Sequence, residues 1–335
     1  MRPGRAPVIP ATSSGALVSV ITPAHNAARF IGETIDSVRN QTYRNWEMLI
    51  VDDQSSDATM AIARAGAAAD PRIRCASTPR NLGAGPTRNH AIEMARGQYI
   101  AFLDSDDLWD PAKLETQVKF MKERRTAFSF TGYRVITEAG DPIGSLRDIP
   151  VRLSYRELLK RNPIGCLTVM LDRSQIGDIA FPPFRTNQDF ALWLEILRRG
   201  VDAEGLAEEL ASYRIVEGSN TRNKLKSARN VWRVYRAQPL HSLDLVWLYA
   251  HYALNGLRKH LRTGACLGTI RQRLGLDLGQ VASATSASVS ESAHLSGALS
   301  LIAGNRPTVA NILTDHQAGG AWSCQGRRRG CSASR

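Results

Sequence analysis

The sequence predicts an α/β protein whose core is an open, mostly parallel sheet flanked by helices. Over residues 16–107, apolar stretches of strand length alternate with stretches of helical periodicity. Such alternation is typical of βαβ units, whose crossover helices join parallel strands. Three of the four apolar stretches also end in polar clusters, and sheets of this kind bind ligands at the carboxyl ends of their strands. We therefore expect these clusters to meet in one crevice.

Residues 16–107 supply four strands and three helices. The first strand, "ALVSVITPAHN", is β-branched and closes at Pro23, and the helix after it carries apolar residues at helical spacing from Phe30 to Val38. The third helix ends at Gly97, a residue that often terminates helices. The predicted strands are 16–26, 46–57, 72–77 and 98–107. The predicted helices are 28–41, 57–69 and 85–97.

The pattern is looser after residue 110. A helix over 111–123 has Pro111 at its first position, where proline is favoured. A strand over 127–137 precedes a turn at 141–144. Three further helices are predicted over 154–162, 189–200 and 232–262.

Composition divides the chain into four parts. Residues 1–15 read as a disordered lead, 16–235 as the α/β domain, 236–268 as an amphipathic helical extension, and 269–335 as a low-complexity, disordered tail. The net charge is +12, which suits an anionic partner. Because +4 of it lies beyond residue 270, the case for a polyanion is weaker than the total suggests. No basic patch with interleaved aromatic residues is present, so we expect no nucleic-acid partner.

The five cysteines are scattered and form no CxxC pair, which argues against a zinc site and a disulfide framework. This pattern predicts a reducing cytoplasm. The amino-terminal stretch shows no secretory signal, and no run of about 18 apolar residues predicts a membrane span.

The segment "AFLDSDDLWD" places three carboxylates within four positions, at Asp104, Asp106 and Asp107. Since side chains alternate along a strand, Asp104 and Asp106 should lie on the same side. Two carboxylates so placed suit a hard divalent cation such as Mg²⁺, which fills its other positions with water and substrate phosphates. The alternative is a capping network for the next helix, although Asp110 before Pro111 could cap it alone.

Three other polar positions are candidates for binding or catalysis. Asp52 and Asp53 end the second strand, where an acid can accept hydrogen bonds from a ribose or a base. The alternative is that this polar segment only caps the next helix, through Asp57 or Ser55. Arg88, at a helix start in "NLGAGPTRNHAI", could receive a phosphate, although the segment lacks the third glycine of a dinucleotide fingerprint. Asp189, just ahead of an amphipathic helix, is either a general base or an N-terminal acid that the helix dipole favours.

Together these segments resemble the inverting glycosyltransferases of family 2, which have the Rossmann-like GT-A fold. The stretches that carry the resemblance are "VSVITPAHNAARFIGETIDSVRNQTYRNWEMLIVDDQSSDAT", "NLGAGPTRNHAIEMARGQYIAFLDSDDLWDPAKLETQV" and "NQDFALWLEILRRG". It covers residues 17–262, with four separated motifs in the family's order. Within the family, the chain is most similar to bacterial enzymes that build capsular, exopolysaccharide or teichuronic-acid-type polymers.

The resemblance implies a role for each motif. The nucleoside would be held by the first strand end and the acid of "VDD", which are Thr22, Pro23, His25, Asn26 and Asp53 here. Asp104 and Asp106 match the family's DxD motif and would bridge Mn²⁺ or Mg²⁺ to the donor diphosphate. Arg88 would lie beside the nucleotide, and Asp189 would be the catalytic base. The chain departs from the family at Gln188, where Glu is usual, which bears on acceptor positioning and on the pKa of the base; His25 replaces the usual Tyr.

The expected function is thus metal-dependent, inverting transfer of a sugar from a nucleotide donor, a UDP-sugar, to a glycan or lipid-linked acceptor. Two alternatives remain. One is a degenerate sugar-nucleotide-binding or scaffold protein, suggested by Gln188 and the tail. The other is a sugar-phosphate nucleotidyltransferase, which would carry a Gly-rich basic loop where "TPAHNAARF" stands. From position and charge, Lys224 or Lys226 could close over the diphosphate. The helix over 243–262 either packs on the domain or lies on the cytoplasmic membrane face.

Overall fold

The computed structural model describes residues 15–146, 149–184, 186–216, 224–241, 243–245 and 247–249. Residues 1–14 of the expected lead, the part of the expected helix beyond 249 and the tail over 269–335 lie outside these residues.

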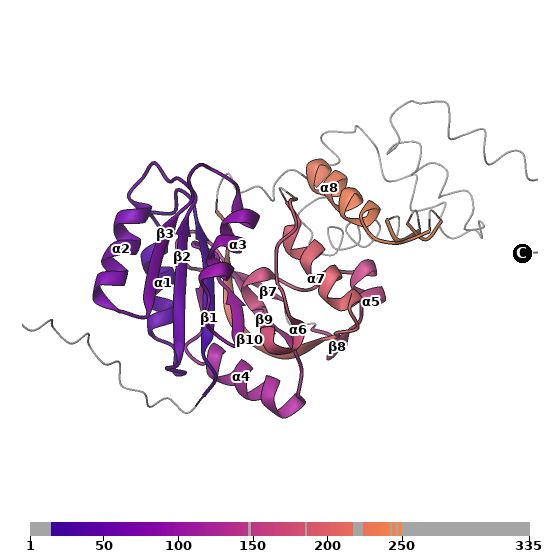
Figure 1. The fold of residues 1–335 in the computed structure, drawn as a ribbon, viewed down its shortest axis with the longest axis horizontal. Helices are drawn as coiled ribbons and strands as arrows, with labels where there is room; N and C mark the ends of the chain where they lie inside the picture. The colour runs from indigo at the N-terminus through magenta and orange to yellow at the C-terminus, as the bar shows by residue number, and fades with distance from the viewer. Residues whose placement is uncertain are drawn as a thin grey trace, which may run out of the picture. The chain divides into compact units, whose positions relative to one another are not determined.

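The first half of the chain forms the predicted parallel sheet, in the order β3-β2-β1-β4. Its strands are β1 (Val18–Ala24), β2 (Trp46–Asp52), β3 (Ile73–Ser77) and β4 (Tyr99–Phe102). Its crossover helices are α1 (Ile31–Arg39), α2 (Thr59–Ala69) and α3 (Ala84–Met94). Figure 1 shows these helices flanking the strands, as the sequence predicts.

Beyond β4 the sheet becomes mixed, which qualifies the expectation of a mostly parallel sheet. The order continues as β9-β6-β10-β5, with β7 on β6 and β8 on β10. Only β6 and β10 pair in parallel there, and the other pairs are antiparallel. The strands are β5 (Leu108–Trp109), β6 (Phe128–Ile136), β7 (Pro142–Leu146), β8 (Arg152–Leu153), β9 (Met170–Asp172) and β10 (Ala203–Arg214).

The helices of the second half are α4 (Lys113–Arg124), α5 (Tyr155–Lys160), α6 (Arg173–Ile176), α7 (Gln188–Arg198) and α8 (Lys224–Arg236), with a 3₁₀ turn, η1, at Cys166–Thr168. Helix α8 begins at Lys224, so the expected start at residue 232 was wrong. The predicted turn at 141–144 was also wrong: Thr137 to Asp141 form the turn, and Pro142 begins β7. Within the described residues, none of the helices has the length and hydropathy needed to cross a bilayer.

An aromatic cluster anchors α7 to the sheet and thereby positions the start of that helix. Trp193 is fully buried, and its ring centroid lies 5.7 Å from that of Phe102 on β4 and 5.3 Å from that of Phe128 on β6. Phe181 packs edge-on against Phe102 at 5.3 Å. Aromatic rings prefer such edge-to-face packing. The cluster fixes α7 against β4 and β6, so that Asp189 stands near the end of β4.

Candidate active site

A cavity of about 230 Å³ lies near the carboxyl end of β4. It brings together two carboxylates predicted from distant motifs, Asp104 after β4 and Asp189 on α7. Its remaining lining residues are Asp107, Tyr133, Gly165, Cys166, Leu167 and Tyr213. A cavity with converging acids is a typical place for acid–base chemistry.

Arg88 is tied directly to this cavity. Its Nη2 donates to Asp104 Oδ1 at 2.5 Å, and its guanidinium lies 5.2 Å from the Phe181 ring centroid. The Arg88 side chain is only 6% exposed, and its Nε has no hydrogen-bond partner among the described residues. Burial by itself lowers the pKa of Arg88, but the carboxylates of Asp104 and Asp189 reverse this and raise it. A permanent positive charge therefore stands between the two acids.

The pKa is raised for three acids, namely Asp107 and Asp189, which line the cavity, and Asp106, which does not line it. Burial, with the nearby Asp104 charge, raises the pKa of Asp106 to about 6. Burial and the charges of Asp106 and Asp104 raise the pKa of Asp107 well above its usual value. Burial also raises the pKa of Asp189, an effect that Asp104 reinforces and that the Phe190 amide and Arg88 oppose. Each ionised carboxylate here gains from an added positive charge.

Asp53, predicted to hold the nucleoside, stabilises the loop between β3 and α3 through its carboxylate. Its carboxylate accepts hydrogen bonds from the Leu82 amide at 2.8 Å, the Gly83 amide at 2.7 Å and the Thr78 hydroxyl at 2.9 Å. Burial alone raises the pKa of Asp53, but these hydrogen bonds outweigh it and lower the pKa. Gly83 has φ 87°, a left-handed conformation that suits glycine. The ionised Asp53 thus fixes the backbone just before α3, which carries Arg88.

Asp52 and Asn26 join the loops that follow β2 and β1. The Asp52 carboxylate accepts from the Ser55 amide at 3.1 Å, and the Ser55 hydroxyl accepts from the Asn26 amide at 2.9 Å. The Asn26 side-chain oxygen accepts from the Ser56 amide at 2.9 Å. Asn26 itself has φ 50°, a conformation that asparagine tolerates better than most residues. Both side chains therefore stabilise the loop after β2 by accepting hydrogen bonds from its backbone amides.

The other predicted nucleoside residues lie at the same strand ends. Thr22 and Pro23 are buried in β1, and Thr22 Oγ1 has no hydrogen-bond partner within the described residues. His25 is exposed, with Nδ1 2.9 Å from the backbone oxygen of Asp53 and Nε2 3.2 Å from the Asn26 amide nitrogen. None of the three lines the cavity, so the predicted residues form two groups, one at the ends of β1 and β2 and one around Asp104.

Gln188, where the family resemblance implies Glu, faces α3. It is buried, and a Cβ placed on Gly85 would lie 2.7 Å from its Oε1. A Cβ atom at 2.7 Å from that oxygen would be closer than van der Waals contact allows. The absence of a side chain at Gly85 therefore lets the Gln188 side chain approach α3. Gln188 is absent from the cavity lining, although it immediately precedes Asp189.

Several residues around the cavity were missed by the sequence reasoning. Asp107 belongs to the predicted acidic segment but was not assigned a role, while Tyr133 and Tyr213, whose ring centroids lie 6.2 Å apart, were not singled out. The buried Arg214 ends β10, a strand that was not predicted. The extra acid in "DSDD" was a usable signal for Asp107. The sequence around Arg214, "ASYRIVEG", has no comparable signal.

The carboxylates after β4 fit a hard divalent cation in their chemistry. Within the residues described, no three His, Cys, Asp or Glu side chains converge as a ready metal site. Mg²⁺, however, usually takes one or two protein carboxylates and completes its shell with water and phosphate oxygens. Asp106 has a raised pKa, which indicates a carboxylate whose ionised form would gain from a cation. The side chains of Lys224 and Lys226, at the start of α8, lie outside the described structure.

Comparisons with known proteins point to one family. Residues 19–172 match the family model described as "Glycosyl transferase family 2". The chain is 47% identical over 246 residues to the putative teichuronic acid biosynthesis glycosyltransferase TuaG of Bacillus subtilis, covering 73% of this chain and 98% of that protein. It is 36% identical over 245 residues to WfgD of Escherichia coli, described as a UDP-Glc:alpha-D-GlcNAc-diphosphoundecaprenol beta-1,3-glucosyltransferase, covering 73% and 95%.

Solved structures share the fold at low sequence identity. The S. aureus TarS fragment 1–349 in complex with UDP-GlcNAc aligns with a TM-score of 0.56 and 19% identity, over 70% of this chain and 71% of that one. The mannosyltransferase PcManGT from Pyrobaculum calidifontis, in complex with GDP-Man and Mn²⁺, aligns with a TM-score of 0.55 and 19% identity, over 88% and 82%. The predicted α/β, GT-A architecture is confirmed.

Proposed function

Because this chain belongs to glycosyl transferase family 2, we propose that it transfers a sugar, with inversion, from a nucleotide-diphosphate donor to a hydroxyl group of a glycan or lipid-linked acceptor. The process would be synthesis of a bacterial surface polysaccharide, in keeping with the names of the relatives. One observation carries the proposal: Asp189 and Asp104 line one cavity beyond the end of β4, and Arg88 donates a hydrogen bond to Asp104.

Asp189 is the proposed general base. The acceptor oxygen forms a bond to the anomeric carbon of the donor sugar while the bond from that carbon to the phosphate oxygen breaks. The acceptor proton passes to the Asp189 carboxylate, and the electron pair of the broken bond leaves with the nucleoside diphosphate. A raised pKa makes Asp189 a better proton acceptor than an ordinary aspartate, provided that it is ionised.

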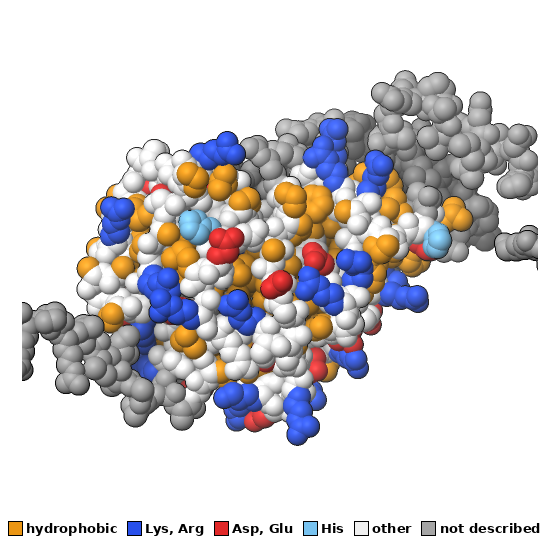
Figure 2. Space-filling model, viewed as in Figure 1, with side chains coloured by type: hydrophobic (Ala, Val, Ile, Leu, Met, Phe, Trp, Pro, Cys, Tyr) orange, Lys and Arg blue, Asp and Glu red, His pale blue; other side chains and the backbone are white. Residues whose placement is uncertain are grey.

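The donor is proposed to be a UDP-sugar, because the donor in the name of WfgD and the TarS ligand are both of this class. The nucleoside would bind at the ends of β1 and β2. The residues proposed there are Thr22, Pro23, His25, Asn26, Asp52 and Asp53. On the face shown in Figure 2, Lys and Arg side chains lie beside and below the acidic groups near the middle of the view, and their positive charge favours an anionic ligand.

Asp104 and Asp106 are the proposed carboxylates for Mn²⁺ or Mg²⁺, in keeping with the Mn²⁺ bound to PcManGT. When bound, such a cation neutralises negative charge that develops on the departing diphosphate. Arg88 contributes a second, permanent positive charge beside Asp104. The Nε of Arg88 has no hydrogen-bond partner among the described residues, so it could donate to a phosphate oxygen of the donor.

The proposed acceptor is lipid-linked, as the name of WfgD describes for that enzyme, and the proposed location is cytoplasmic and peripheral on the inner membrane face. Two large apolar side chains are exposed in the last helical residues described: Leu243 is 85% exposed and Trp247 is 57% exposed. Exposed apolar side chains of this size can enter the boundary of a bilayer.

The decisive experiment measures donor binding and slow donor hydrolysis. The purified chain is incubated with UDP-, GDP- and dTDP-sugars, with Mn²⁺ and with EDTA, beside Asp189→Asn. We expect metal-dependent binding of UDP-sugars, with hydrolysis reduced at least a hundredfold in Asp189→Asn. Binding in both proteins without turnover, even with lipid-linked acceptors added, would favour the degenerate binding protein. A folded chain that binds no donor would refute the proposal.

A further inference from the structure

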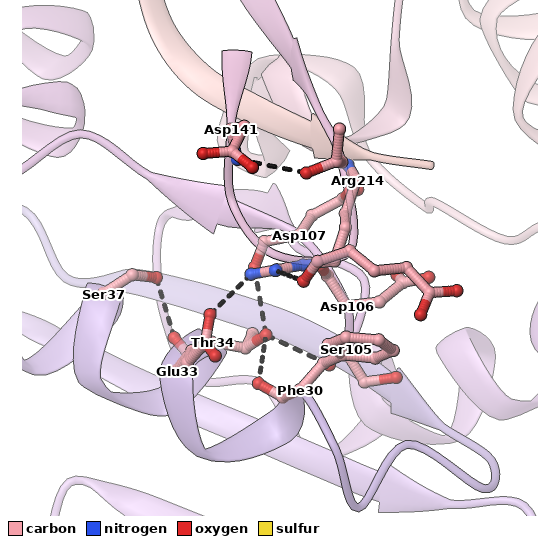
Figure 3. Close-up of polar contacts among 11 residues, drawn as sticks. Phe30, Glu33, Thr34, Ser37, Ser105, Asp106, Asp107, Asp141 and Arg214 are labelled. Atoms are coloured by element: carbon pink, nitrogen blue, oxygen red, sulfur yellow. Dashed lines mark hydrogen bonds and ion pairs between the residues drawn. The ribbon is translucent and has the colours of Figure 1, made fainter. Parts of the chain in front are cut away.

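Arg214 is a buried arginine behind the acidic turn that follows β4. It is the last residue of β10, and its side chain is only 1% exposed. Figure 3 shows its guanidinium between the turn at Ser105–Asp107 and α1, close to Glu33 and Thr34. Burying an arginine in this way is unfavourable unless its donors are satisfied. Its contacts therefore identify what it serves.

Arg214 holds the acidic turn at two points. Its backbone amide donates to Asp107 Oδ1 at 2.9 Å, and its Nε donates to the backbone oxygen of Asp106 at 2.8 Å. The Thr34 hydroxyl supports the same turn from α1, within 3.0 Å of the backbone oxygens of Ser105 and of Asp107. Hydrogen bonds from Thr34 and Arg214 thus fix the peptide groups on both sides of Asp106.

The rest of the guanidinium is anchored to two further segments. Nη1 donates to the backbone oxygen of Glu138, in the turn between β6 and β7, at 2.7 Å. Nη2 pairs with the carboxylate of Glu33 on α1 at 2.6 Å. The guanidinium also lies 4.9 Å from the Phe30 ring centroid. One planar side chain with fixed donors joins the turn, α1 and the β6–β7 turn, which a lysine could not do.

This arrangement answers a problem set by the sequence. Three carboxylates within four positions repel one another, and in a flexible turn they would move apart. Arg214 gives the turn a fixed backbone and places a positive charge behind it, while the Asp106 side chain makes no ion pair within the described residues. Asp106 is left for a cation from outside the protein.

We infer that Arg214 is a positioning residue, which fixes the Ser105–Asp107 turn so that Asp106 stays oriented toward a divalent cation and the donor diphosphate. The inference rests on the proposed function for the identity of that cation. It assigns Arg214 no contact with substrate. Residues that orient metal ligands from behind commonly change metal affinity ten- to a hundredfold when they are replaced.

The test compares two variants by Mn²⁺ binding in the presence of UDP and by hydrogen exchange of residues 104–107. Arg214→Lys keeps the charge but loses the planar donors, and we expect Mn²⁺ binding about ten- to a hundredfold weaker and faster exchange in the turn. Glu33→Gln removes one anchor at an exposed position, 59% accessible, and should weaken Mn²⁺ binding roughly threefold. Both should raise the KM for Mn²⁺ more than they lower kcat.

Asp36→Asn is the matched control, because Asp36 is an exposed carboxylate on the same helix that pairs with Arg39 and not with the turn. It should change neither measurement. If Arg214→Lys does not fold, Glu33→Gln decides the question. Folded variants with wild-type Mn²⁺ affinity and wild-type exchange would overturn the inference. Faster exchange in variants of a chain that binds no Mn²⁺ at all would support the positioning role and refute the proposed metal dependence instead.

Discussion

At the residue scale, the properties of the site come from where carboxyl groups are buried and what faces them. Asp53 is buried but receives three hydrogen bonds, so its pKa is lowered. Asp107 and Asp189 are placed near other acids, and burial raises the pKa of each. The same type of side chain is therefore a stable anion at Asp53 and, at Asp189, a group that binds a proton more readily, as the proposed base requires.

The raised pKa of Asp189 predicts the pH dependence of turnover. A base must be ionised, so kcat/KM should rise as pH rises through the pKa of Asp189 in the folded chain. This acid limb should lie above the usual aspartate value of about 3.9. Gln188→Glu adds a negative charge next to Asp189 and should move the limb upward by up to about one unit. The measurement is a pH–rate profile of both chains; an unmoved limb would show that residue 188 is too remote to affect the base.

The raised pKa of Asp107 predicts that removing its charge stabilises the folded chain. Its folded-state pKa is raised, so its contribution favours folding at low pH and is lost as pH rises through that pKa. At pH 7 the buried carboxylate opposes folding. Asp107→Asn keeps an oxygen for the Arg214 amide and should increase the free energy of unfolding by on the order of 1 kcal/mol at pH 7.

Thermal unfolding at pH 7 and pH 4 measures this effect. The gain should be smaller at pH 4 than at pH 7, because the raised pKa favours the protonated form of this carboxyl group in the fold as pH falls. Asp178→Asn, at an exposed position, should leave stability unchanged at both values. An Asp107→Asn chain that is less stable than wild type at pH 7 would contradict the expectation.

At the element scale, periodicity predicted the regular elements well and the irregular ones poorly. Helices α1 to α4 and strands β1 to β4 have clear apolar patterns, and the structure confirms them. Strand β9 has only three residues, too few for a period. Strand β10 is half exposed, rich in Glu and Ala, and interrupted by two register shifts against β6, so its sequence shows no alternation. Arg214 was missed for this reason.

The aromatic cluster that anchors α7 should tolerate some substitutions of Trp193 better than others. Trp193→Ala empties the space between Phe102 and Phe128 and should cost about 3–5 kcal/mol of unfolding free energy. Trp193→Phe keeps a ring and loses no hydrogen bond, since the indole nitrogen has no partner among the described residues, so it should cost clearly less. Urea unfolding of both variants measures the difference; equal losses would show that the ring itself is not what anchors α7.

At the scale of the whole molecule, the proposed chemistry needs only part of the chain. All residues that line the cavity lie between 104 and 213. The matched relatives are covered almost completely by about three quarters of this chain. Strand-end geometry predicted a place for Asp104, because parallel strands bring their carboxyl ends together. The role of Asp189 was predicted only from the family resemblance, since Asp189 lies in the first turn of α7 and does not end a parallel strand.

A chain truncated after residue 268 should therefore keep donor turnover. The measurement compares its rate and its circular dichroism spectrum with those of the full chain, and we expect rates within about twofold, since surface changes away from a site have small effects. Loss of turnover with the fold intact would mean that the residues beyond 268 take part in the reaction.

The contact between Arg88 and Asp104 has a consequence for the order in which the site fills. The Arg88 guanidinium donates to the Asp104 carboxylate at 2.5 Å, so an incoming cation competes with a positive charge that the protein carries itself. A donor phosphate that draws Arg88 toward itself frees Asp104 at the same moment. Cation and nucleotide should then bind as mutually dependent ligands, each weak without the other, because the coupling free energy between two sites is reciprocal.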